Sequence, residues 1–137
     1  IHLCGKGKMD ETYNGREGYV QFEYINKELK DLFAAADVIV SRAGANAICE
    51  LLALKKPNIL IPLSAAASRG DQILNAESFE RQGFSYVLKE ENVTNETLLA
   101  AVNEVYANRE KYVAAMNESK LNSAIETITE MIVTLSK

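Results

Sequence analysis

Two kinds of hydrophobic pattern alternate along the chain. Short continuous apolar runs are typical of strands in a parallel sheet, and apolar positions spaced three and four apart are typical of helices. The run Asp-Val-Ile-Val at 37–40 predicts a strand that is buried on both faces. Strands are predicted at 1–4, 19–22, 37–40, 58–61 and 84–88, and helices at 27–36, 46–55, 71–82, 94–106, 109–118 and 123–135.

This alternation of strands and helices indicates βαβ units. The predicted fold is one α/β domain over residues 1–137, with a Rossmann-like, doubly wound parallel sheet and C-terminal helices. Asp71 is expected as the N-cap of its helix and Gly83 as the C-cap. Thr94 is expected to cap the next helix, with Glu96 in the first turn, where a carboxylate suits the positive end of the helix.

Several residues are expected to pack or turn rather than to bind. The segment 64–70 is interpreted as a small polar loop, and 5–8 (Gly-Lys-Gly-Lys) as a turn, since it lacks the spacing of a P-loop. The expected packing residues are Ile48, Leu51, Leu52 and Leu54 on the inner face of one helix, Cys49 in the same helix, and Tyr106, Tyr112 and Met116 in the tail.

Composition and charge narrow the classes of function. The chain has 137 residues, 47% of them hydrophobic and 25% charged, which suits one globular domain. A net charge of −4 provides no basic surplus and argues against a nucleic-acid partner. Cys4 and Cys49 lie far apart and indicate reduced thiols in a cytosolic setting. Because His2 is the only histidine, no His-based metal cluster can form, and neither metal nor cofactor is expected.

The ends and the apolar runs of the sequence carry two further expectations. No run approaches the roughly 20 apolar residues that span a bilayer, and no signal peptide opens the chain. Ile1 lies within a predicted strand and is not an initiator Met, so the chain is expected to be a fragment.

The crossing from the strand at 37–40 to the following helix carries polar residues that core packing does not require. Ligands of open parallel sheets bind beyond the carboxyl ends of the strands. Here the helix start offers N–H groups to a diphosphate, Gly44 can adopt positive φ, and Glu50 can accept hydrogen bonds from ribose hydroxyls. A tight turn at Gly44 and a dipole contact at Glu50 explain the pattern equally well. The candidates are Ser41, Arg42, Gly44, Ala45, Asn46 and Glu50.

A second crossing, 68–75, contributes Asp71, Gln72 and Asn75 as candidates. Gln72 and Asn75 are three residues apart and share a helix face. Amide side chains both donate and accept hydrogen bonds, which suits sugar hydroxyls. An ordinary surface helix would show the same pattern, so both interpretations stay open.

Taken together, these residues resemble the C-terminal domain of the MurG family, the bacterial peptidoglycan N-acetylglucosaminyltransferases of GT-B architecture. The resemblance implies transfer of GlcNAc from UDP-GlcNAc to undecaprenyl-diphospho-muramoylpentapeptide (lipid I), giving lipid II with inversion. It also implies a peripheral enzyme on the cytoplasmic side of the bacterial cell membrane. It rests on the order and spacing of 36–45, Glu50-Leu51, Lys56-Pro57, Ile61-Pro62-Leu63, Asp71-Gln72 and Asn75-Ala76.

The resemblance also implies roles for single residues, with a positively charged cradle instead of a metal at the leaving UDP. The implied contacts are the backbone of Ile25 to uracil, Glu50 to the ribose hydroxyls, Ala45 and Asn46 to the diphosphate and sugar, and Asp71 and Gln72 to GlcNAc hydroxyls.

Two parts of the family pattern are missing from this sequence. One is an opening strand with a GGS-type loop that grips the donor phosphates. The other is the N-terminal domain that binds lipid I and supplies the general base, so the chain alone is expected to be inactive. The alternatives are a non-catalytic UDP-sugar-binding subunit of a two-chain GlcNAc transferase and a UDP-GlcNAc 2-epimerase-like domain. The segment 64–69 differs from the Thr-Glu-Arg-Pro type loop of epimerases, which argues against the latter.

Overall fold

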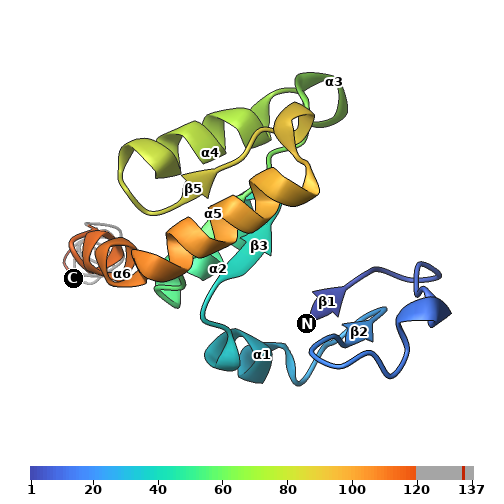
Figure 1. The fold of residues 1–137 in the computed structure, drawn as a ribbon. Helices are drawn as coiled ribbons and strands as arrows, with labels where there is room; N and C mark the ends of the chain where they lie inside the picture. Colours follow the sequence, from blue (N-terminus) through green and yellow to red (C-terminus); the bar gives the residue numbers. More distant parts are fainter. Residues whose placement is uncertain (120–133, 135–137) are drawn as a thin grey trace. The chain divides into compact units, whose positions relative to one another are not determined.

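The computed structural model describes residues 1–119 and 134, and the helix predicted at 123–135 falls almost wholly outside them (Figure 1). The chain divides into two compact units, Ile1–Ala36 and Asp37–Lys137. Both units contain parallel strands and helices, so the fold is of the predicted Rossmann-like α/β class.

Unit 1 is built around a pair of short parallel strands, β1 (His2–Leu3) and β2 (Gln21–Phe22). The 3₁₀ turn η1 (Glu11–Tyr13) lies between them in the chain, and helix α1 (Leu29–Ala35) follows. The turn predicted after β1 is confirmed, because Gly5 and Gly7 have φ of 88° and 69° and the Lys8 N–H donates to the Gly5 carbonyl.

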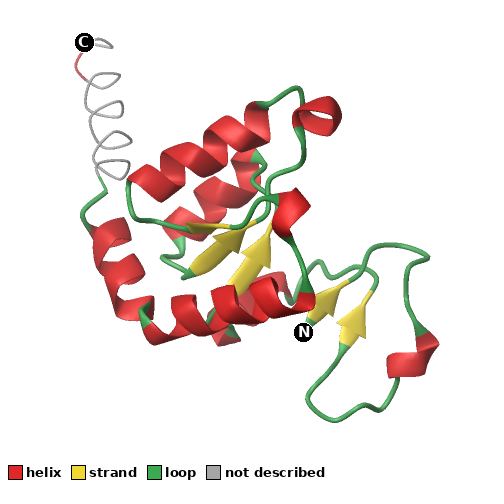
Figure 2. Cartoon of the chain, turned by 45° about the horizontal axis from the view of Figure 1, so that its top comes forward, coloured by secondary structure: helices red, strands yellow, loops and turns green. Residues whose placement is uncertain are grey.

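Unit 2 contains a parallel sheet (Figure 2). The strand order is β3-β4-β5. Each strand is shorter than its predicted run, and β3 ends one residue later than predicted, at Ser41. The elements are β3 (Ile39–Ser41), α2 (Ala45–Ala53), β4 (Asn58–Leu60), α3 (Ala65–Ser68), α4 (Asp71–Arg81), β5 (Tyr86–Val87), η2 (Glu90–Asn92), α5 (Asn95–Ala107) and α6 (Arg109–Asn117).

Helices cover both faces of this sheet, which confirms the predicted doubly wound arrangement (Figure 2). Ile59 and Leu60 follow one another in β4 and therefore point to opposite faces. Leu60 packs in a cluster with residues of α2, α4 and α6, whereas Ile59 packs with Ala101 and Val105 of α5. Met116 is buried in the first cluster and Tyr112 packs against both, as predicted for the tail.

The predicted helix ends are confirmed at two places. Gly83, with φ of 74°, donates to Glu80, and Phe84 donates to Phe79, a Schellman arrangement that stops α4. Thr94 caps α5 through the N–H of Thr97 and forms a reciprocal capping box with the Thr97 side chain.

Two predictions about unit 2 are wrong at the level of elements. The strand at 37–40 is not buried on both faces, because Val40 is 45% exposed. Val40 lies on the same face as Ile59 but on the outer strand β3, outside the cluster that α5 covers. The segment 64–70 is not only a loop, since it contains the short helix α3.

Three residues predicted to pack are exposed instead. Leu54 follows Ile48 by six residues, which at 3.6 residues per turn places it about two thirds of a turn away around the helix. Its side chain, at the end of α2, is 45% exposed. Cys49 is likewise exposed beside the buried stripe of α2. Tyr106 is 49% exposed and stacks under the Arg109 guanidinium, 4.6 Å from its ring centre.

Candidate functional site

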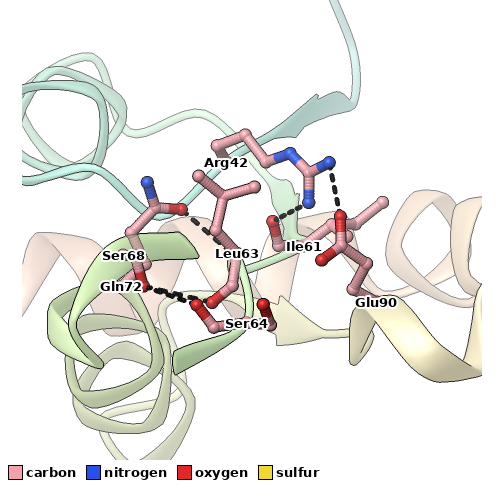
Figure 3. A network of polar contacts seen from close by, with 7 residues as sticks. All are labelled: Arg42, Ile61, Leu63, Ser64, Ser68, Gln72 and Glu90. Carbon is pink, nitrogen blue, oxygen red and sulfur yellow. Dashed lines mark hydrogen bonds and ion pairs between the residues drawn. The ribbon is translucent and has the colours of Figure 1, made fainter. Parts of the chain in front are cut away.

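The loops that follow β3, β4 and β5 are joined at the carboxyl edge of the sheet. Arg42 follows β3, Ile61 follows β4, and Glu90 begins η2 after β5. The Arg42 Nη2 lies 2.8 Å from the Glu90 Oε1, and the Arg42 Nη1 donates to the Ile61 carbonyl at 3.2 Å (Figure 3). This is the edge at which parallel α/β sheets bind ligands.

Gly44 is the N-cap of α2, and it does not use the positive φ that a glycine can adopt. Its φ of −67° and ψ of 144° are open to any residue. A Cβ added here would meet nothing within 4 Å, so the space beside the first turn is open. Gly44 also has no side chain to cap the first N–H groups of α2. An open, uncapped helix start of this kind suits an anion.

The other predicted residues of this crossing differ in whether their side chains form hydrogen bonds within the protein. Ser41 ends β3, and its Oγ donates to the Arg42 carbonyl at 3.0 Å. Ala45 and Asn46 are the first two residues of α2 and are exposed. Glu50 is also exposed, one turn after Asn46 on the same helix face. Neither polar side chain has a hydrogen-bond partner among the described residues, so both remain accessible to a ligand.

Asp71 is the first residue of α4, and its predicted role as N-cap is wrong. The chain enters α4 through two left-handed residues, Arg69 with φ of 55° and Gly70 with φ of 86°. This entry makes Gly70 the N-cap and shifts Asp71 into the first turn, where it is exposed. A carboxylate at that place complements the helix dipole.

Gln72 and Asn75, predicted to face a sugar, hold α4 against the sheet loops. The Oε1 of Gln72 accepts a hydrogen bond from the Leu63 N–H at 3.1 Å, in the loop after β4 (Figure 3). The Nδ2 of Asn75 donates to the Ala43 carbonyl at 3.0 Å, in the loop after β3. Each amide keeps its second polar atom without a partner among the described residues, so a structural role does not exclude a ligand contact.

Ile25 is the one predicted site residue in unit 1, where it lies half-buried between β2 and α1. Its backbone contact to uracil stays a prediction. The remaining predicted residues lie in unit 2, on the loops and helix starts at the carboxyl edge of the sheet.

Sequence analysis missed Glu90 as a residue of this edge. An acidic residue soon after the last predicted strand is a weak signal, and nothing in the local sequence identifies Arg42 as its partner. Within residues 1–119 and 134, no group of three or more His, Cys, Asp or Glu side chains is arranged to hold a metal ion.

A parallel sheet with helices on both faces, and with polar loops joined beside an open helix start, defines a Rossmann-like ligand-binding domain. The profile of the glycosyltransferase family 28 C-terminal domain matches residues 1–131, and the chain belongs to this family.

Curated relatives are similar over nearly the whole chain. A protein of Lachnoclostridium phytofermentans is 68% identical over 132 residues, which cover 96% of this chain and 37% of the relative. One of Lachnospira eligens is 60% identical over 137 residues, 100% of this chain and 39% of the relative. One of Clostridium botulinum is 58% identical over 132 residues, again 96% and 37%.

All three relatives carry the name UDP-N-acetylglucosamine–N-acetylmuramyl-(pentapeptide) pyrophosphoryl-undecaprenol N-acetylglucosamine transferase. The chain spans less than two fifths of their length.

Proposed function

We propose that this chain is the donor-binding part of an inverting transferase that moves GlcNAc from UDP-GlcNAc to undecaprenyl-diphospho-muramoylpentapeptide in peptidoglycan synthesis. The observation that carries the proposal is the 68% identity, over 96% of the chain, to a relative named for a transfer of this kind. The family match over residues 1–131 supports the transferase class. The open, uncapped start of α2 at the carboxyl edge of the sheet supports binding of the donor there.

The diphosphate of UDP would lie against Gly44, Ala45 and Asn46 at the start of α2. This position combines uncapped N–H groups, the positive end of a helix and open space beside Gly44. Arg42 would add a cation at the same edge, and Ser41 would complete the polar lining of the crossing. As the sugar is transferred, negative charge develops on the leaving UDP, and these groups would stabilise it without a metal.

The nucleoside and the sugar would then lie on either side of the diphosphate. Glu50 lies one helical turn, about 5.4 Å, further along α2 and would accept hydrogen bonds from the ribose hydroxyls. The backbone of Ile25 would contact uracil. Asp71, Gln72 and Asn75 would bind hydroxyls of GlcNAc, using the polar atoms that the fold leaves unpaired.

The acceptor and the general base would be held outside this chain. The relatives are more than twice as long, so we propose that lipid I binds to another part of the complete protein. We also propose that this protein is peripheral at the cytoplasmic side of the cell membrane. Among the described residues, no helix is long and apolar enough to cross a membrane. No nucleic-acid partner is proposed, since the net charge is −4.

A second candidate is a UDP-sugar-binding subunit that works with a separate acceptor-binding chain. The length of the complete gene product separates the two, because an acceptor domain in the same polypeptide excludes the subunit.

The donor site is tested by titrating UDP and UDP-GlcNAc into this chain and into the complete gene product, with ADP as control. Amide NMR shifts are expected at Ile25, at 44–50 and at 71–75, with the uridine nucleotides alone. The absence of shifts in both proteins at millimolar ligand would refute the site.

Glu50→Gln removes the charge of the proposed ribose contact and keeps the shape of the side chain. Affinity for UDP is expected to fall about tenfold, because hydrogen bonds to a charged group are stronger than neutral ones. The matched control is Glu110→Gln, the same change at an exposed residue of α6. Equal effects of the two variants would exclude Glu50 from the site.

A further inference from the structure

The ion pair between Arg42 and Glu90 joins the loop after β3 to the turn after β5. The sequence carries 15 basic and 19 acidic residues. Among pairs of oppositely charged side chains that both belong to the described residues, this pair lies within salt-bridge distance, with the Arg42 Nη2 2.8 Å from the Glu90 Oε1. Both side chains remain partly exposed, 48% for Arg42 and 41% for Glu90, so the pair lies open to a ligand at the carboxyl edge.

Two contacts fix the guanidinium of Arg42 in one plane. Its Nη2 pairs with the Glu90 carboxylate, and its Nη1 donates to the Ile61 carbonyl (Figure 3). A guanidinium has five N–H donors, so further donors stay available. A long, exposed arginine without such contacts samples many rotamers, and binding a ligand would have to immobilise it.

Glu90 is itself held by a chain of hydrogen bonds. It is the first residue of η2, whose turn closes through the Asn92 N–H to the Lys89 carbonyl at 2.9 Å. The Asn92 carbonyl accepts a hydrogen bond from the Thr97 hydroxyl at 2.7 Å, which ties η2 to the first turn of α5. The backbone of Glu90 is therefore fixed, and its carboxylate can hold the guanidinium of Arg42 in place.

We propose that Glu90 is a positioning residue: it holds the Arg42 guanidinium ready for the diphosphate of a nucleoside diphosphate bound at the start of α2. This inference rests on the proposed function. Glu90 also repels a diphosphate, but it is partly exposed, so water and salt weaken that repulsion. The positional effect does not depend on that screening, and we expect it to outweigh the repulsion.

The test compares UDP with uridine, which lacks the phosphates, as ligands of the complete gene product. Glu90→Ala and Glu90→Gln are expected to lower affinity for UDP about three- to tenfold and to leave affinity for uridine unchanged. Arg42→Ala is expected to lower UDP affinity at least as much. The double variant is expected to bind UDP like Arg42→Ala alone, because Glu90 acts through Arg42.

Glu91→Gln is the matched control, since it removes the same charge from the same turn, and Glu91 is exposed. Thermal unfolding of each variant checks the fold, and Glu90→Gln preserves the shape of the side chain. Unchanged or tighter UDP binding in both Glu90 variants would overturn the inference, as would additive losses in the double variant. An equal loss of affinity for UDP and for uridine would mean that the ion pair only stabilises the fold. If the unchanged protein binds no uridine nucleotide, the proposed function fails and this inference fails with it.

Discussion

The absence of a side chain at Gly44 leaves open space beside α2, but the backbone conformation there does not require a glycine. Its φ of −67° suits any residue, and an added Cβ would meet nothing within 4 Å. Gly83 is the opposite case, because its φ of 74° is left-handed and an added Cβ would lie 3.6 Å from the Ala115 Cβ. The fold needs the glycine at 83, whereas only a ligand lying against α2 would need the glycine at 44.

Gly44→Ala is therefore expected to change the free energy of unfolding by less than about 1 kcal/mol, the usual loss when alanine replaces a good N-cap. Affinity for UDP is expected to fall about tenfold, since the methyl group would occupy the space of the diphosphate. Gly83→Ala is expected to lose about 1–2 kcal/mol of stability and to keep its UDP affinity. Urea unfolding and UDP titration measure both quantities. A stability loss at Gly44 as large as that at Gly83 would show that the fold itself requires Gly44.

Gln72 and Asn75 show where prediction from local sequence ends. Their spacing predicts one helix face near the start of α4, and the structure has both on that helix. Their partners, the Leu63 N–H and the Ala43 carbonyl, belong to loops after other strands. Only the packing of α4 against the sheet creates these contacts, so no periodicity could reveal them. The same holds for the pairing of Arg42 with Glu90.

Among the elements, the end of α4 and the start of α5 were predicted correctly from local sequence. Gly83 and Thr94 act on N–H and carbonyl groups within a few residues of themselves, so their roles are visible in the sequence. The burial of Val40 depends on how far α5 extends over the sheet, which is a property of tertiary structure. The start of α4 depends on the left-handed conformation of Arg69, a residue type that gives no sign of it.

The start of α5 makes stability depend on pH through Glu96. A backbone hydrogen bond at Glu96 itself, and then the Thr94 hydroxyl, hold the pKa of this carboxyl below its ordinary value of 4.5. A carboxyl with a lower pKa in the folded state stabilises that state when ionised. This contribution is fully present above the ordinary pKa and is lost as the pH falls through the lowered one.

Glu96→Gln is expected to be less stable than the unchanged chain at pH 7 and to match it at strongly acidic pH, where Glu96 is protonated in both states. Glu96→Asp keeps a carboxylate in the first turn and is expected to keep the pH dependence. Urea midpoints from pH 2 to 7 measure the difference. A constant gap between Glu96→Gln and the unchanged chain at every pH would contradict the assignment.

Across the whole molecule, burial is distributed unevenly between the two units. All the buried hydrophobic residues among those described belong to unit 2, and Gln21 is the buried residue of unit 1. Leu3 and Phe22 are paired in register across β1 and β2, yet they are 47% and 36% exposed. The apolar pattern predicted these strands correctly, but a pattern does not show how much apolar surface the folded chain covers. Unit 1 therefore has little core of its own to resist local opening.

Hydrogen exchange compares the units through two matched amides. The Cys4 N–H donates to the Phe22 carbonyl in unit 1, and the Leu88 N–H donates to the Leu60 carbonyl in unit 2, each at 3.0 Å. Although the two bonds have equal length, the Cys4 amide is expected to exchange about 100-fold faster or more, because opening unit 1 exposes little apolar surface. Equal protection of the two amides would refute this account of burial.

Hydrogen exchange measured with added uridine nucleotides also tests the proposed contact of Ile25 with uracil. A ligand that binds only the closed form stabilises that form by RT ln(1 + [L]/Kd), about 2.7 kcal/mol at 100 times Kd. If uracil binds the backbone of Ile25, saturating UDP must therefore slow exchange at Ile25 and Cys4 by up to about 100-fold, and ADP must not. If UDP instead slows exchange only at the start of α2, then unit 2 alone binds the nucleotide. Ile25 would then leave the list of donor contacts, while Glu50 and the start of α2 would stay.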